Sequence, residues 1–172
     1  MDNYFDTGDA VAYHPDGKLK IVLDSQDLRK LNPDSKLKNG ALVLPDGMYE
    51  YLEGEEFTYN DVEKLVEREL SQDEALQHLI WRVVARDPAL LKEYVPKMFE
   101  EMKKRFDYDE NMGIYLDSFD KTPKLGALHV VRLGGWSGLD GGGCLDNGSG
   151  RLVGYLAPEA QSAADKVVVN EH

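Results

Sequence analysis

The residues with the clearest chemical potential lie near the C-terminal end of the chain. Cys144 is the single cysteine among the 172 residues, and His129 precedes it. A cysteine nucleophile requires a histidine as its base and a further group that orients this base, which Asp140, Asp146 or Asn147 could supply. A small hydrolase or transferase built on Cys144 and His129 is therefore one hypothesis. No family-type motif surrounds the cysteine, and lone cysteines are usually buried apolar fillers, so we favour a non-enzymatic chain.

A glycine-rich stretch between two apolar runs contains this cysteine. Nine of the 16 glycines lie between Gly134 and Gly154. Consecutive backbone N–H groups can bind an anion, but no lysine occurs between Lys124 and Lys166, which excludes a P-loop. The spacing from Gly148 onwards also departs from the dinucleotide-binding fingerprint. We predict an interaction or structural loop over residues 134–150, with these candidate binding residues in it and on its flank: Trp136, Ser137, Asp140, Arg151 and Tyr155.

Two short pieces flank this stretch. Arg132-Leu-Gly-Gly-Trp-Ser-Gly138 and Arg151-Leu-Val-Gly-Tyr155 are similar to the Arg-Gly-Gly-Ser-Trp and Gly-Phe-Arg ends of C-type-lectin-like domains of the formylglycine-generating type. The resemblance implies the fold of those domains. Because the first piece has an extra leucine and inverts Trp and Ser, we do not base the predicted fold on it. We instead expect Trp136 and Tyr155 to pack over an edge of the core.

The segment from Asp107 to Ser118 resembles the calcium loop of an EF-hand. Asp107, Asp109 and Asn111 fall at ligand positions one, three and five. Position six, which needs glycine for a sharp turn, is Met112, and position twelve, which supplies a bidentate glutamate, is Ser118. We therefore predict a solvated acidic turn, and a calcium-stabilised module is an alternative. No other cofactor is expected.

The charge of the chain restricts its partners. The formal net charge is −12, from 32 acidic and 20 basic residues. Nucleic acids and anionic membranes both require concentrated positive charge, so neither is expected as a partner. A single cysteine forms no internal disulfide, which is typical of a reducing compartment. The N-terminus lacks the apolar segment of a signal peptide. No run approaches the roughly 20 apolar residues that cross a bilayer. We expect a cytoplasmic protein that binds another protein or a second copy of itself.

The N-terminal third reads as β-structure. Residues 1–8 are expected to be a loose terminus. Two extended runs follow around Pro15-Asp16-Gly17, in which proline fixes φ and glycine accepts a positive φ, so a β-hairpin is predicted. Ser25 can cap a short helix over residues 26–31. Residues 41–52 repeat the pattern around Pro45-Asp46-Gly47, which predicts a second hairpin with Tyr49 and Tyr51 on one side of its second strand.

The middle third reads as helical. A capping box starts a helix at Asn60, and a second box, formed by Ser71 and Glu74, starts another that runs through Val84. Asp87-Pro88 begins a third helix that extends to Phe106, since proline suits the first helical position. Pro96 is expected to kink or split this helix. The sequence thus predicts two to three helices over residues 60–106.

Strands over residues 127–133 and 151–156, joined by the glycine-rich loop, complete the predicted architecture. Because strands and helices are segregated, the fold class is α+β rather than a doubly wound parallel sheet. We expect one domain over residues 1–172, with a β-rich part at 9–56, a helical part at 60–106, a β part at 127–156 and a C-terminal tail at 157–172. The predicted function is protein association: an assembly or accessory component, an inhibitor, or an immunity-type protein with an acidic face.

Overall fold

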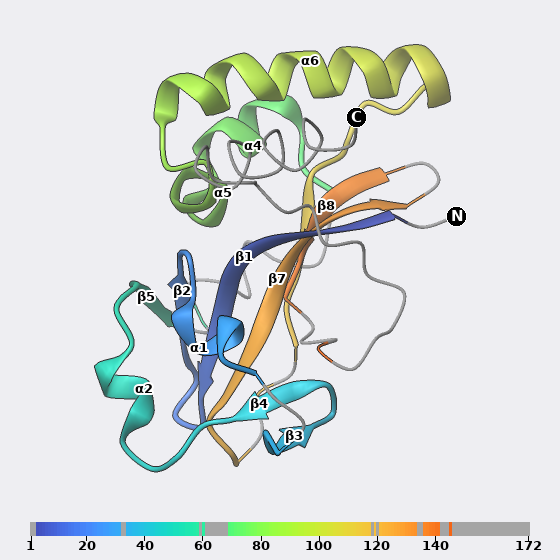
Figure 1. Cartoon of the computed structure of the whole chain (residues 1–172). Helices are drawn as coiled ribbons and strands as arrows, with labels where there is room; N and C mark the ends of the chain where they lie inside the picture. The colour runs from blue at the N-terminus through green and yellow to red at the C-terminus, as the bar shows by residue number, and fades with distance from the viewer. Residues whose placement is uncertain are drawn as a thin grey trace, which may run out of the picture.

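The computed structural model describes residues 3–31, 34–58, 60, 69–117, 119, 121–133, 136–141 and 145. The helix predicted to start at Asn60 falls mostly outside these residues, as do the strand predicted at 151–156 and the tail. The described part is an α+β structure, as predicted, with one largely antiparallel sheet and a group of helices at one end of it (Figure 1).

The sheet has the order β3-β4-β7-β1-β2-β5, and β8 joins it beside β7. All of these pairs are antiparallel, whereas β6 pairs in parallel with β8. Figure 1 shows β1 (blue) and β7 (orange) side by side through the middle of the sheet. The strands are β1 (Asn3–His14), β2 (Lys18–Val22), β3 (Leu37–Lys38), β4 (Ala41–Val43), β5 (Glu55–Thr58), β6 (Gly113–Tyr115), β7 (Lys124–Leu133) and β8 (Trp136–Asp140).

The first predicted hairpin is confirmed. β1 and β2 pair from Ala10 opposite Val22 to His14 opposite Lys18. Gly17 has a φ of +78°, and its N–H donates to the His14 carbonyl at 3.0 Å. Glycine reaches this φ without steric cost, so the Pro-Asp-Gly tripeptide closes the turn locally.

The prediction of a loose terminus over residues 1–8 is wrong for the described residues, because β1 begins at Asn3. Its first part pairs with β7, from Asn3 opposite Arg132 to Asp6 opposite His129. The register then shifts at a bulge, where Gly8 has a φ of +75°. The partner strand lies more than a hundred residues away in sequence, so local patterning gives no sign of this pairing.

The second predicted hairpin is also wrong. Residues Met48–Tyr51 form a helical turn, α2, which follows Gly47 at a φ of +75°. Tyr49 is buried and Tyr51 is 83% exposed, so the two tyrosines do not share a face. β4 instead pairs with β3 and β7. Because β7 already satisfies one edge of β4 and β3 the other, no edge is left for residues 48–52.

In the described residues the predicted helices are present, but one of them is divided into two. The Ser71–Glu74 capping box is present, but the predicted helix breaks at His78, whose extended backbone separates α4 from α5. The third helix starts at Pro88 with Asp87 as its N-cap, and Pro96 does not split it. The helices are α1 (Gln26–Arg29, capped by Ser25 as predicted), α2, α4 (Gln72–Gln77), α5 (Leu79–Val84) and α6 (Pro88–Phe106).

Two apolar clusters cover the two faces of the sheet. The larger joins Val11, Tyr13 and Leu128 from the sheet to helical residues such as Ile80 and Val95. The smaller lies on the opposite face, where Ala10, Ala12 and Leu125 pack with Leu44, Tyr49 and Leu52. The alternation of strand side chains assigns residues to the two faces. The helices α4, α5 and α6 thus cover one face at one end of the sheet, and α2 and the β3–β4 pair lie at the other end (Figure 1).

Candidate functional site

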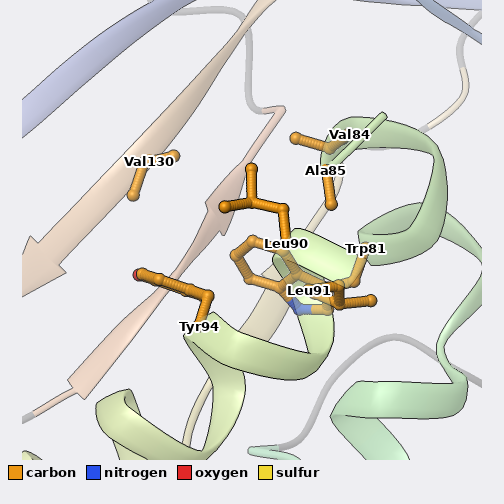
Figure 2. A pocket seen from close by; sticks show the side chains of 7 residues that line it. All are labelled: Trp81, Val84, Ala85, Leu90, Leu91, Tyr94 and Val130. Atoms are coloured by element: carbon orange, nitrogen blue, oxygen red, sulfur yellow. The ribbon is translucent and has the colours of Figure 1, made fainter. Parts of the chain in front are cut away.

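An apolar groove lies between α5, α6 and β7. It has a volume of about 270 Å³, and its seven lining residues carry no formal charge. Figure 2 shows Val130 on β7 across the groove from Leu90 and Tyr94, which come from the first turns of α6. The lining residues are Trp81, Val84, Ala85, Leu90, Leu91, Tyr94 and Val130.

The corner between α5 and α6 creates this groove. Arg86 has a φ of +60°, and its N–H donates to the Val83 carbonyl at 3.0 Å, which ends α5. Asp87 then caps α6, with its carboxylate accepting from the Ala89 N–H at 2.8 Å. Because proline at the next position fits the first helical turn, the chain reverses within a few residues. Both helices therefore present apolar side chains to the same part of β7.

Trp81 forms one wall of the groove. Its ring is buried, and its Nε1–H donates to the Met112 carbonyl at 2.7 Å. A buried indole N–H needs such a partner. Because the polar atom is satisfied inside the core, the indole offers only its carbon surface to the groove.

The mouth of the groove exposes apolar surface. Leu90 is 55% exposed and Tyr94 is 37% exposed, whereas Leu91 beneath them is buried. Partial burial raises the pKa of Tyr94, so its hydroxyl stays neutral at physiological pH. A neutral, apolar groove suits the burial of an apolar side chain from a partner and offers no acid, base or nucleophile for catalysis.

The structure brings together two of the candidate catalytic residues. His129 on β7 lies directly opposite Asp140 on β8. Directly opposed residues of antiparallel strands point to the same face. Cys144 and Asp146 lie outside the described residues, so the pairing of Cys144 with His129 stays a prediction.

The glycine-rich stretch is not a loop throughout. Its first part forms β8, in which Trp136 lies opposite Leu133 and Ser137 opposite Arg132. Gly138 lies opposite Gly113 of β6. The prediction of a loop over residues 134–150 is therefore wrong for residues 136–140, because two strands from other parts of the chain pair with them. The candidate residues Arg151 and Tyr155 lie outside the described part of the chain.

The described end of β8 is fixed by Tyr13. The Tyr13 hydroxyl donates to the Gly141 carbonyl at 2.8 Å and accepts from the Asp117 N–H at 3.0 Å. A Cβ at Gly141 would lie 2.9 Å from Val11 Cγ2, so any other residue there would require the neighbouring side chains to shift. Farther along, the Leu145 N–H donates to the Gly40 carbonyl at 2.8 Å. At both points the glycine-rich stretch is tied to the sheet.

The acidic turn after α6 is organised around a lysine. Lys103 Nζ lies 2.7 Å from Asp107 Oδ1 and 3.0 Å from Asp109 Oδ1, and this contact lowers the pKa of Asp107. Asn111 is buried, and its side-chain oxygen accepts from the Met112 N–H at 2.9 Å. Within the described ranges, no three His, Cys, Asp or Glu side chains gather closely enough to hold a metal ion.

The groove residues of α6 were not predicted from the sequence. Within the predicted third helix, Leu90 and Tyr94 are one helical turn apart and line the groove beside the buried Leu91 and Val95. A second pair of large apolar residues at i and i+4 beside a core stripe widens the apolar face beyond what one core needs. That widening was the signal in the sequence.

The comparisons with known proteins bear on the fold. No protein-family model and no curated protein matches the chain. A solved structure described as the accommodation of massive sequence variation in Nanoarchaeota by the C-type lectin fold is similar to it, with a TM-score of 0.54 and 19% identity. The similarity covers 81% of this chain and 70% of the other.

Among the helices of the described residues, none is long and apolar enough to cross a membrane.

The short resemblance around Arg132 and Arg151, which we left out of the fold prediction, points to the same fold as the structural comparison. The α+β architecture of this chain therefore matches the C-type lectin fold.

Proposed function

We propose that this chain is a protein-binding module that docks a partner through the apolar groove between α5, α6 and β7. The observation that carries the proposal is the exposure of Leu90 and Tyr94 above a buried apolar floor. Exposed apolar patches with a hollow at their centre mark interaction sites, and anchor residues bind in such hollows. A fold that accommodates extensive sequence variation in another protein is also suited to recognition.

The charge of the chain defines the partner further. A protein with a net charge of −12 attracts a basic protein and repels a second copy of the same chain. The occupant is thus an apolar side chain of a partner protein whose surrounding surface carries lysine and arginine. Complementary charge raises the rate of association, and the apolar anchor supplies most of the affinity.

The experiment compares two matched pairs of variants. Leu90→Glu and Tyr94→Ser alter the groove, whereas Leu37→Glu and Tyr51→Ser alter exposed residues of the same types on β3 and α2. Partners captured by the wild-type protein are purified, and their affinities are measured by calorimetry. We expect a loss of about tenfold or more for the groove variants, since a buried apolar anchor contributes roughly 1.5–3 kcal/mol.

Two results would contradict the proposal. Equal affinity of the groove variants and their matched controls would place the docking surface elsewhere. Concentration-dependent dimerisation of the pure protein, measured by sedimentation and abolished by Leu90→Glu, would make a second copy the occupant.

A further inference from the structure

A second cleft, on another side of α5, combines apolar walls with two arginines. It has a volume of about 470 Å³ and lies between α5 and the β2–β5 edge of the sheet. Leu23 and Phe57 form its wall on the sheet side, and Leu79 and Val83 form its wall on α5. This cleft shares no lining residue with the groove of Figure 2.

The two guanidinium groups of the cleft differ in their partners. Arg86 Nη2 lies 2.6 Å from Oδ1 of the buried Asp9 and 3.3 Å from Oδ2 of Asp24, so its position is fixed and its charge is balanced. Arg82, one helical turn earlier, has no carboxylate of the described chain within 4 Å. Among the described residues, this exposed arginine beside an apolar wall thus keeps its charge and five N–H donors for a ligand.

The charge of the cleft favours an anionic ligand with a single negative group. Arg82 is a local positive charge in a protein whose net charge is −12. Glu55, at the start of β5, lines the same cleft and repels any second carboxylate. Arginine binds a carboxylate through two parallel N–H···O bonds, which fixes the direction of the bound group.

The sheet edge indicates that the ligand is a polypeptide. β5 is the last strand in the order of the described sheet, and there it pairs with β2 alone. Glu55 and Phe57 are two positions apart in β5 and both line the cleft. The backbone of β5 therefore runs along the rim of the cleft. An extended peptide can hydrogen-bond to such an edge while one of its side chains occupies a neighbouring pocket.

We infer that this cleft binds the C-terminal residue of a partner polypeptide, with the last apolar side chain between Phe57 and Val83 and the terminal carboxylate on Arg82. The inference goes beyond the proposed docking groove and does not depend on it. It assigns a role to the one arginine of the cleft that the described chain does not neutralise.

The test uses a matched pair of peptides. An N-acetylated tetrapeptide ending in Val-Leu is prepared as the free acid and as the C-terminal amide, and each is titrated into the ¹⁵N-labelled full-length chain. We expect the free acid to shift the backbone amide signals of residues 55–57 and 79–86. The affinity for the amide should be lower by a factor of about ten or more, because the amide lacks the charged carboxylate that would accept hydrogen bonds from Arg82.

Four variants sharpen this test. Arg82→Gln should abolish the difference between acid and amide, whereas Arg105→Gln, which alters an exposed arginine on α6 paired with Glu101, should retain it. Glu55→Gln should strengthen binding of the free acid, since it removes a like charge. Leu90→Glu should leave all of these results unchanged, which separates this inference from the proposed docking groove.

Several results would overturn the inference. Equal binding of acid and amide, or a retained difference in Arg82→Gln, would remove the role of the carboxylate. Decanoate serves as a further probe, and if it bound as tightly as the peptide, the cleft would recognise an apolar carboxylate without a peptide backbone. An absence of shifts at residues 55–57 would remove β5 from the site.

Discussion

Tyr13 shows how one side chain connects remote parts of the chain. Its ring is buried against Phe119, and its hydroxyl connects β1 to Gly141 and to the backbone of Asp117. Lys124, which is also buried, pairs with Asp117 beside the same ring. The end of β8 and the start of β7 are thus held at one point.

Removal of the Tyr13 hydroxyl should destabilise the protein. Tyr13→Phe leaves the Gly141 carbonyl and the Asp117 N–H without this partner in a buried place, which costs about 1–3 kcal/mol. Urea denaturation followed by fluorescence measures the change in the free energy of unfolding. Tyr51→Phe, at an exposed position, is the control and should be within about 0.5 kcal/mol of wild type. An equal effect of the two substitutions would show that the hydroxyl contributes nothing.

The same tyrosine should make the protein sensitive to alkali. Burial raises the pKa of Tyr13, so the folded state keeps the proton that the unfolded state loses above about pH 10. The unfolded state then binds fewer protons, and the free energy of unfolding falls as pH rises. In Tyr13→Phe this fall between about pH 10 and pH 11 should be shallower. Denaturation curves at several pH values test this, and parallel slopes for wild type and variant would contradict it.

At the scale of elements, Arg86 joins the helical layer to the sheet. It follows Ala85, the C-cap of α5, and contacts Asp9 at the bulge of β1 and Asp24 after β2. Asp9 also accepts from the Asp24 N–H at 2.9 Å. One guanidinium group therefore fixes the position of the α5–α6 corner on which both the groove and the cleft depend.

The two ion pairs of Arg86, with Asp9 and with Asp24, should contribute unequally to the free energy of unfolding. Asp24→Asn should change the free energy of unfolding by less than about 1 kcal/mol, because Asp24 is exposed and surface ion pairs contribute little. Arg86→Gln should cost more, about 1–3 kcal/mol, since it leaves the buried Asp9 without its charged partner. Thermal or urea unfolding of both variants decides this. Equal effects would mean that burial of Asp9 adds nothing to the pair.

At the scale of the whole molecule, the excess of acidic residues is the dominant property. The net charge of −12 favours a basic partner and opposes compaction through self-repulsion. Local pairs such as Lys97–Glu93 and Arg105–Glu101 on α6 offset only part of this repulsion.

Salt should therefore stabilise the protein. Raising the NaCl concentration from about 0.01 M to about 0.1 M shortens the screening length from about 30 Å to about 10 Å, which weakens long-range repulsion more than contact pairs. We expect an increase in the free energy of unfolding of below about 1 kcal/mol, measured by urea denaturation at each salt concentration. A decrease would indicate that the surface ion pairs outweigh the repulsion.

The sequence by itself determined the features whose causes are local. The Pro15-Asp16-Gly17 turn, the Ser25 cap, the Ser71–Glu74 capping box and the start of α6 at Pro88 each depend on residues within a few positions of one another. Their backbone preferences operate in the unfolded chain as well. The segregation of strands from helices was likewise visible, and with it the α+β class.

Only the tertiary structure decided which segments pair and which surfaces stay exposed. β8 within the glycine-rich stretch and the first residues of β1 become strands because β7 lies beside both, and residues 48–51 become a helical turn because the edges of β4 are already paired. The groove likewise needs Leu90 and Val130 to meet across forty residues of sequence. Pairing and packing energies of this kind depend on contacts that exist only once the chain has folded, so no local pattern records them.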